Sequence, residues 1–504
     1  MCPSTTSSRR MAPCPFVPAF CYPPPSVAHT PSQPPALKRS IRFRDLTLFF
    51  VAASLSIRWS ATAAASGPSS LIVWIAALLC FFLPLAGSVM ELSSRYPAEG
   101  GLYVWARHAF GDGCGFLAAW TYWMSNLPYF PGVLYFGAAS ALFAFGARGR
   151  ALAASPTYYM LFAGIALAVI ILLNIRGVDA GKWLNNVSSF GAMLPLALLI
   201  VLGAVSWARF GSATPFNVST MTLHWSVRNA VFWSTIFFAF VGIEAGSFMG
   251  DEIDTPRRTI PLAILAGGAI TTIGYICGTA ALLVALPGDA VSGPDGIVNG
   301  LHALTSRLGL DWLLPAAALL VALNAIGGAA AFLSSSSRLP FVAGIDHYLP
   351  PIFGAIHPRY RTPWISIGFY GLASIAVALL GQAGTTVRGA YDVLVSMAVL
   401  VTFLPFLFIF ASMIRLQWLT AGPEVRRVPG GKPVAILLGI LGLLSTLVAI
   451  GLSAFPSDDD PNKPLAVLKV VGSGAIVVVA GIGLYLVGRS KGRKLRDETA
   501  KIRA

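Results

Sequence analysis

The chain has 504 residues, of which 56% are hydrophobic and 11% are charged, and its formal net charge is +15. A soluble globular domain carries about 25% charged residues, so this composition excludes an ordinary soluble protein and indicates a membrane protein with many spans. The excess of Lys and Arg does not indicate a nucleic-acid partner, because these residues gather in the tails and in alternate loops between apolar segments. We therefore expect the lipid bilayer to surround the chain.

Residues 1–40 are rich in Pro and Ser and lack the continuous apolar core of a secretory signal. We expect a disordered basic tail here, with Met11 as an alternative start. The six cysteines show no CxxC or Cys/His spacing of the kind that binds metal. The sequence therefore predicts neither a metal site nor a cofactor.

Runs of about 20 mainly apolar residues predict about 12 membrane-spanning helices. Their expected starts, in chain order, lie near Leu46, Ser70, Phe116, Thr157, Val187, Arg228, Ile260, Trp312, Trp364, Tyr391, Pro433 and Leu465. Most of the 35 Lys and Arg residues fall on one side if the N-terminus is cytoplasmic. This positive-inside bias predicts an integral protein of the cell membrane with both termini in the cytoplasm.

The first apolar segment contains an arginine, Arg58, in the run VAASLSIRWSATAAASGP. Arg58 lies about twelve residues, or roughly 18 Å, from the start of the span, too deep for its charge to reach either surface easily. It needs a partner, and three are available: Glu244, an anionic part of a substrate, or the carboxyl ends of half-helices. A structural pair with Glu244, a substrate or gating role, and an error in our register all remain open.

The third apolar segment carries a cluster of aromatic residues, in AAWTYWMSNLPYFPG from Ala118 to Gly132. Tyr122, Trp123 and Tyr129 are predicted to form an aromatic wall beside a substrate. Aromatic side chains at helical spacing more often serve packing, so ordinary packing is the alternative.

The segment FFAFVGIEAGSFMGDEIDTPRRTIP, Phe237 to Pro261, places the acid Glu244 between Gly242 and Gly246 inside an apolar run. A carboxylate at bilayer depth costs a few kcal/mol, so Glu244 is expected to face the bundle interior or an aqueous cavity. The glycines weaken the helix where an unwound backbone could bind a solute. A pair of small residues packed against another helix is the alternative.

A dense charge cluster follows this segment. Its acids are Asp251, Glu252 and Asp254, and its bases are Arg257 and Arg258. These groups can neutralise each other at the cytoplasmic mouth, in pairs that break and re-form between inward-closed and inward-open states. Ordinary interfacial charge is the other interpretation. Further arginines are expected on the same side, namely Arg95, Arg107, Arg338 and Arg361.

Three stretches together resemble the amino acid-polyamine-organocation superfamily of secondary transporters. They are MELSSRYPAEGGLYVWARHAFG (Met90 to Gly111), the Phe237 to Pro261 segment, and SSSSRLPFVAGIDHYLPPIFGAIHPRYRTPW (Ser334 to Trp364). The resemblance covers roughly 43–487. It implies an all-α fold with a five-plus-five inverted repeat, in which helices 1 and 6 are discontinuous and hold the substrate near mid-membrane.

Composition, charge and this resemblance together divide the chain into four parts. They are a tail at 1–40, a transport core of helices 1 to 10 at 41–415, two peripheral helices at 416–488, and a basic cytoplasmic tail at 489–504.

The resemblance also implies the substrate-binding residues. In helix 1, relatives carry a glycine-rich break whose amide groups bind a substrate carboxylate, and here Ala53, Ser54 and Leu55 stand at that place, with Ser56 and Arg58 just beyond. The glycines are missing, which makes strong unwinding less certain. The other implied residues lie on helices 3 and 6, and are Asn126, Phe240, Val241, Gly242, Ile243 and Glu244.

The sequence gives little information about which ion, if any, is coupled to transport. Some proton-coupled relatives use a lysine on helix 5, but Val187 to Leu199 has none, and Ala192 stands near that place. The hydroxyls of Ser334 to Ser337 offer a sodium site, although serines at such a place also bond to the backbone of their own helix, the interpretation that we favour.

The expected function is a secondary active transporter, a permease, which moves amino acids or related amines by alternating access. The alternatives are a transporter-like solute sensor without net transport and a polyamine-specific permease or exchanger. No HExxH motif or nucleophile elbow is present, so the sequence does not predict an enzyme. It leaves open the particular substrate, the coupling ion (H⁺ or Na⁺), the direction of transport and the oligomeric state.

Overall fold

The computed structural model describes residues 40–224, 226–291, 295–345, 348–382, 387–420, 422–453 and 463–503. The predicted tail at 1–39 and the loop at 454–462 lie outside this part of the chain. The described residues form helices and no strand, apart from one isolated bridge between Ile41 and Ile253. The prediction of an all-helical protein is confirmed.

The α-helices are α1 (Phe43–Ser54), α2 (Arg58–Ala64), α3 (Ser70–Ala77), α4 (Leu83–Arg95), α5 (Leu102–Phe110), α6 (Asp112–Leu142), α7 (Gly146–Leu152), α8 (Pro156–Arg176), α9 (Val178–Phe210), α10 (Val218–Met221), α11 (Val227–Phe238), α12 (Pro256–Ala285), α13 (Gly296–Leu308), α14 (Leu314–Ser336), α15 (Arg338–Ile345), α16 (Trp364–Gln382), α17 (Val387–Leu416), α18 (Gly431–Ser453) and α19 (Lys463–Arg503). A π-helical segment, η1 (Leu78–Phe82), joins α3 to α4. The 3-10 segments are η2 (Phe143–Phe145), η3 (Ala245–Glu252), η4 (Gly288–Val291), η5 (Asp311–Leu313) and η6 (Pro351–Gly354).

Nine helices of the described chain are long and apolar enough to cross a membrane, or ten if the bent pair α1 and α2 counts as one span. The apolar part of α16, Trp364–Leu379, is shorter than these nine helices. Every predicted span lies on one of the helices above, but α11 is interrupted and falls short of the required length. The count of about 12 crossings and the inverted repeat therefore stay predictions.

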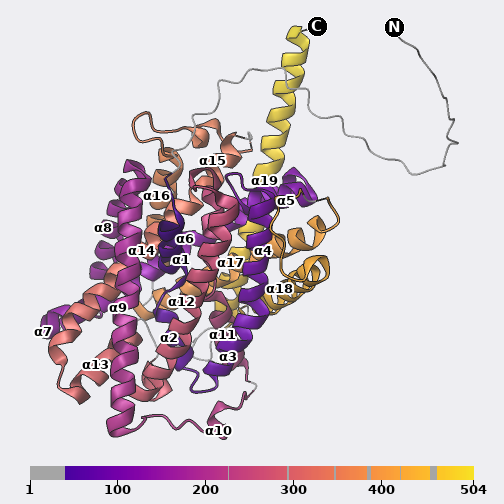
Figure 1. Ribbon diagram of the computed structural model, residues 1–504. Helices are drawn as coiled ribbons and strands as arrows, with labels where there is room; N and C mark the ends of the chain where they lie inside the picture. Colours follow the sequence, from indigo (N-terminus) through magenta and orange to yellow (C-terminus); the bar gives the residue numbers. More distant parts are fainter. Residues whose placement is uncertain are drawn as a thin grey trace, which may run out of the picture. The chain divides into compact units, whose positions relative to one another are not determined.

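Burial separates central helices from outer ones. In the apolar stretch of α6, 83% of the residues are buried, and α14 follows with 72%, whereas α18 and α19 have 28% and 17%. In Figure 1, α6 and α14 lie in the middle of the helical bundle, and α18 lies at its edge. The two helices predicted to be peripheral are the least buried of the nine, since most of their apolar side chains face outward as lipid contact requires.

Two helices are interrupted in the middle of the bundle. The first break separates α1 from α2, which are bent by 41° about Leu55 to Ile57. The second follows α11, where turns at 239–244 lead into η3. Discontinuities are thus present at both places where the sequence predicts them.

The two breaks touch at Gly242, which has φ of +128°. A Cβ atom added there would lie 2.8 Å from Ser54 Oγ and 3.0 Å from the carbonyl carbon of Ala53. Only glycine combines this backbone conformation with such close approach. Gly242 therefore brings the α11 break against the α1 break, which positions the site.

Candidate functional site

Tyr275 of α12 is hydrogen-bonded to both breaks. Its single hydroxyl hydrogen is within reach of two carbonyl oxygens, those of Ser54 and Ala239 (3.1 Å for the latter), and its oxygen accepts from the N–H of Ser56 at 3.2 Å. These are backbone groups at the places where the helical ladders stop, and buried backbone groups need partners. Helix 1 is therefore interrupted without a glycine at the break, and the side chain of Tyr275 satisfies the opened backbone directly.

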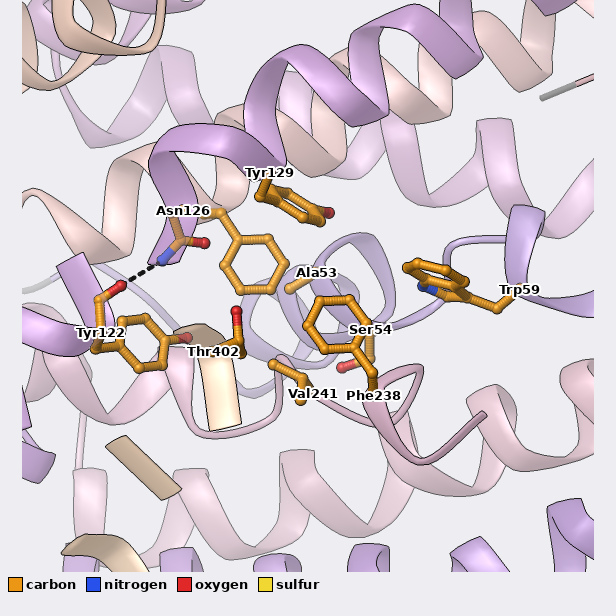
Figure 2. A pocket seen from close by; sticks show the side chains of 10 residues that line it. Ala53, Ser54, Trp59, Tyr122, Asn126, Tyr129, Phe238, Val241 and Thr402 are labelled. Atoms are coloured by element: carbon orange, nitrogen blue, oxygen red, sulfur yellow. Dashed lines mark hydrogen bonds between the residues drawn. The ribbon is translucent and has the colours of Figure 1, made fainter. Parts of the chain in front are cut away.

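A small cavity lies beside the breaks (Figure 2). Its lining comes from α1, α2, α6, α11, α14, α17 and the turn after α11, and consists of Ala53, Ser54, Trp59, Tyr122, Asn126, Tyr129, Phe238, Val241, Phe332 and Thr402. The side chains leave space for about one water molecule. An apolar, aromatic wall with a few polar groups is typical of a small-molecule site. A solute of amino-acid size requires these side chains to move apart.

Glu244 is completely buried behind this wall. Its Oε1 accepts a hydrogen bond of 2.7 Å from the hydroxyl of Tyr122, and its Oε2 accepts one of 2.9 Å from the N–H of Gly242. Tyr122 itself lines the cavity, so a hydrogen bond connects Glu244 to the cavity wall. Gly246, in contrast, packs against Phe50, where an added Cβ would lie 2.6 Å from the ring, so the packing interpretation holds for that glycine.

Arg58 is 3% exposed and makes no ion pair with Glu244 among the described residues, so the structural pair left open by the sequence is absent. Its guanidinium carbon lies 4.1 Å from the ring centre of Trp59 and 5.4 Å from that of Tyr129. Its Nε and Nη1 have no hydrogen-bond partner in the described part of the chain.

A second, smaller cavity lies next to Arg58. It is lined by Arg58, Trp59, Pro128, Tyr129, Gly132, Phe238, Leu394, Val395 and Ala398. It shares Trp59, Tyr129 and Phe238 with the main cavity. Three aromatic rings thus separate the main cavity from the side chain of Arg58.

Asn126 and two of the predicted wall residues, Tyr122 and Tyr129, lie at the main cavity. The amide of Asn126 donates to the carbonyl of Tyr122 at 2.9 Å, a contact visible in Figure 2, and to Ser336 Oγ at 3.4 Å. Tyr122 and Tyr129 line the main cavity. Trp123 lies instead against Tyr370, with ring centres 5.5 Å apart, so the packing alternative holds for this residue.

The structure distributes the predicted site residues over three places. Ala53, Ser54, Asn126 and Val241 line the main cavity, and Arg58 lines the second one. The remaining ones are buried or nearly so but line neither cavity, and are Leu55, Ser56, Phe240, Gly242, Ile243 and Glu244. Their roles in binding stay predictions.

Sequence reasoning missed several lining or bridging residues, namely Trp59, Phe238, Phe332, Thr402 and Tyr275. Thr402 lies on a helix without any of the motifs, whereas Phe332 lies two residues before the motif that begins at Ser334, and only packing brings both to the cavity. Tyr275 had a usable signal, because it is the single large polar residue of a stretch rich in Gly, Ala and Thr.

A buried charge cluster lies at the end of η3, on the side predicted to be cytoplasmic. Arg338 donates from Nε and Nη2 to Glu252 Oε1 at 2.9 and 2.8 Å, and its Nε lies 3.9 Å from Glu99 Oε1. Glu99 also accepts from the N–H of Asp251 at 3.3 Å. Burial, and then the neighbouring Glu252, raise the pKa of Glu99 well above its usual value, although Arg338 opposes the shift.

The partners within this cluster differ from those predicted. Glu252 pairs with Arg338, whereas Arg257 pairs with the exposed Glu424. The reason is tertiary, since Arg338 follows directly on α14, which packs against η3. The arginine that we had placed merely on the same side is the one that neutralises the acid.

Two of the serines at the end of α14, Ser335 and Ser337, donate to backbone carbonyls of their own segment. Ser335 Oγ donates to the carbonyl of Ala331 at 3.1 Å, and Ser337 Oγ donates to that of Ser334 at 2.9 Å. These contacts agree with the backbone-bonding interpretation that we favoured over a sodium site.

Comparison with known proteins agrees with this architecture. The family model for amino acid permeases matches residues 41–482. An uncharacterized transporter of Legionella pneumophila is 26% identical over 448 residues, which cover 88% of this chain and 95% of that protein. The probable agmatine/putrescine antiporter AguD of Lactococcus lactis is 22% identical over 427 residues, 84% of this chain and 89% of its own. The branched-chain amino acid permease BcaP of Bacillus subtilis is 24% identical over 371 residues, 69% of this chain and 75% of its own. A match to the family model over most of the length, on a bundle of apolar helices, shows that the chain belongs to the amino acid permease family.

Proposed function

We propose that the protein is a secondary active transporter of amino acids or related amines that works by alternating access. The observation that carries the proposal is the junction of two broken helices at a small aromatic-lined cavity. Unwound helix segments in the interior of a membrane bundle are tolerated where they line a cavity, and they are the usual place for a transported solute.

The proposed substrate site is the main cavity. Ser54 presents a buried hydroxyl oxygen without a described partner, and Asn126 and Thr402 add polar groups to a wall that is otherwise apolar. Polar groups of this kind orient a ligand, while the rings of Tyr122 and Tyr129 cover its apolar part. Because the space is nearly filled, substrate entry requires the broken helices to move.

The cluster of Glu99, Glu252 and Arg338 is the proposed inner latch. It joins the loop before α5, the end of η3 and the start of α15, three segments that would separate when the cytoplasmic side opens. Its carboxylates and guanidinium are buried, so breaking their contacts is favourable only when water or other partners replace them. The latch thus favours the inward-closed state.

Counterflow into proteoliposomes loaded with an unlabelled amino acid tests the transport proposal. We expect accumulation of labelled substrate, and we expect Thr402→Val to weaken it because the variant keeps the shape of a lining residue and removes its hydroxyl. Thr446→Val in α18, a buried threonine that lines neither cavity, is the matched control and should transport normally. A protein that binds amino acids in a thermal-shift assay without counterflow would be a sensor, not a transporter.

The proposed orientation has a separate test. In a variant without native cysteines, Asp311→Cys, at the start of α14, should react with an impermeant maleimide in intact cells, whereas Arg359→Cys in the loop before α16 should not. Both positions are exposed. The reverse labelling pattern would exclude cytoplasmic termini.

A further inference from the structure

Arg58 is a buried cation whose donors are not all used. A guanidinium has five N–H donors in one plane, and the rings of Trp59 and Tyr129 interact with its charge without accepting those in-plane hydrogens. Its Nε and Nη1 have no acceptor among the described residues. Such a group is strongly unfavourable in a protein interior unless an acceptor arrives from elsewhere.

We propose that Arg58 binds the carboxylate of the transported molecule, so that the protein takes carboxylate-bearing amino acids and rejects the amines that lack this group. The inference rests on the proposed transport function and narrows its substrate class. It distinguishes between two kinds of solute that named relatives handle, amino acids and the amines agmatine and putrescine.

The described side chains around Arg58 include no competing anion. Apart from Arg58, the described residues that line the second cavity are apolar or aromatic, and none of those that line the main cavity is acidic. A guanidinium fork and a carboxylate form two parallel hydrogen bonds, which makes a carboxylate the best-matched ligand. An entering solute would therefore place this group past Trp59 and Tyr129.

Two backbone amides of the helix 1 break, those of Leu55 and Ser56, already have acceptors. The N–H of Leu55 donates to the carbonyl of Val51 at 2.9 Å, and the N–H of Ser56 donates to the carbonyl of Ser54 at 2.9 Å and to the hydroxyl of Tyr275 at 3.2 Å. A carboxylate held by these amides would have to displace existing partners. Arg58, four residues past Ser54, supplies the unused donors instead.

Glu244, the buried acid beside the main cavity, lines neither cavity. Its two oxygens accept hydrogen bonds from Tyr122 and from the N–H of Gly242 instead of facing the cavity. A diamine would bring a cation near Arg58 and would meet no carboxylate among the described lining residues to offset it. An amino acid instead brings its own carboxylate, which the protein lacks at this place.

Matched pairs of compounds test the proposal, each an amino acid with its decarboxylated amine: leucine with 3-methylbutylamine, arginine with agmatine, and ornithine with putrescine. Thermal-shift binding and competition in counterflow are measured for the wild type, Arg58→Lys, Arg58→Met and the exposed-loop control Arg359→Met. We expect the wild type to prefer at least one amino acid over its amine by at least about tenfold. Arg58→Met should abolish the preference, Arg58→Lys should retain part of it, and the control should behave as wild type.

Several results would overturn the proposal. Equal or better binding of the amines by the wild type excludes it without any variant, which covers the case that Arg58→Met does not fold. An unchanged preference in folded Arg58→Met excludes it as well. A chloride requirement that disappears in Arg58→Met, while the preference for amino acids stays, would assign Arg58 to an inorganic anion. If no compound is transported but amino acids bind and amines do not, the transport proposal fails and the assignment of Arg58 stands.

Discussion

Two buried arginines of this protein, Arg58 and Arg338, have opposite surroundings. Both are almost fully buried, at 3% and 2% exposure. Arg338 donates to Glu252 and to the carbonyl of Ser334 and lies near Glu99, whereas Arg58 lies against two aromatic rings and keeps donors without acceptors. Burial of a charge is thus not by itself a sign of function, since the available partners decide whether the charge stabilises the fold or awaits a ligand.

The difference between the two arginines predicts that Arg338→Met has the largest effect on stability. Removal of this arginine leaves Glu252 and Glu99 buried without their counter-charge, which typically lowers the free energy of unfolding by about 3–5 kcal/mol. Arg58→Met leaves no described carboxylate without a partner and should lower it much less. Thermal unfolding of the purified variants in one detergent measures the difference, and equal losses would contradict the distinction between the two arginines.

Glu244 extends the comparison to a buried acid whose partners are all within the site. Glu244→Gln keeps one oxygen for the hydroxyl of Tyr122 but removes the charge, so we expect normal amounts in the membrane and an uptake rate reduced by about tenfold or more. Tyr122→Phe should lower uptake in the same direction, because it frees one carboxylate oxygen and alters the wall. Normal uptake by Glu244→Gln between about pH 5 and 8 would show that the acid has no part in transport.

Tyr275→Phe tests whether the breaks need a side-chain partner. The loss of its hydroxyl leaves the carbonyls of Ser54 and Ala239 without this donor, and a buried unsatisfied group costs about 1–3 kcal/mol. Tyr158→Phe, which loses one bond of 2.9 Å to the carbonyl of Ala138, is the control with the smaller expected loss. The unfolding temperatures of the two variants measure the difference. If Tyr275→Phe unfolds at the same temperature as the wild type, water or the helix itself must satisfy the opened backbone.

The smallest predicted effect is the pH dependence of stability that arises from Glu99 in the latch. Because the pKa of Glu99 is raised in the folded protein by burial and by Glu252, the folded state keeps this proton to higher pH than the unfolded state. The contribution of protonated Glu99 to stability is fully present below the pKa that this residue has in the unfolded protein, near 4.5. It is lost as the pH rises through the raised pKa of the folded protein. Stability should fall gradually over that range in the wild type and less in Glu99→Gln. Parallel melting curves of the two proteins against pH would exclude Glu99 as the titrating group.

Much of the fold could be predicted because its signals are local. Apolar runs identify the helices, and the glycine at 242 beside the acid at 244 indicates the second break. The break in helix 1 was less certain from the sequence, since no glycine marks it. Its cause lies on α12, where Tyr275 satisfies the opened backbone.

The sequence by itself determined the membrane class, the approximate positions of the helices and the presence of Arg58 and Glu244 within apolar runs, while the two interruptions were implied by the resemblance to a family. Only the tertiary structure decided their partners: Tyr122 for Glu244, aromatic rings for Arg58, and Arg338 for Glu252. The physical reason is that hydropathy and helix propensity act between neighbours in the chain, whereas hydrogen bonds and ion pairs depend on distances of about 3 Å between side chains that only helix packing brings together.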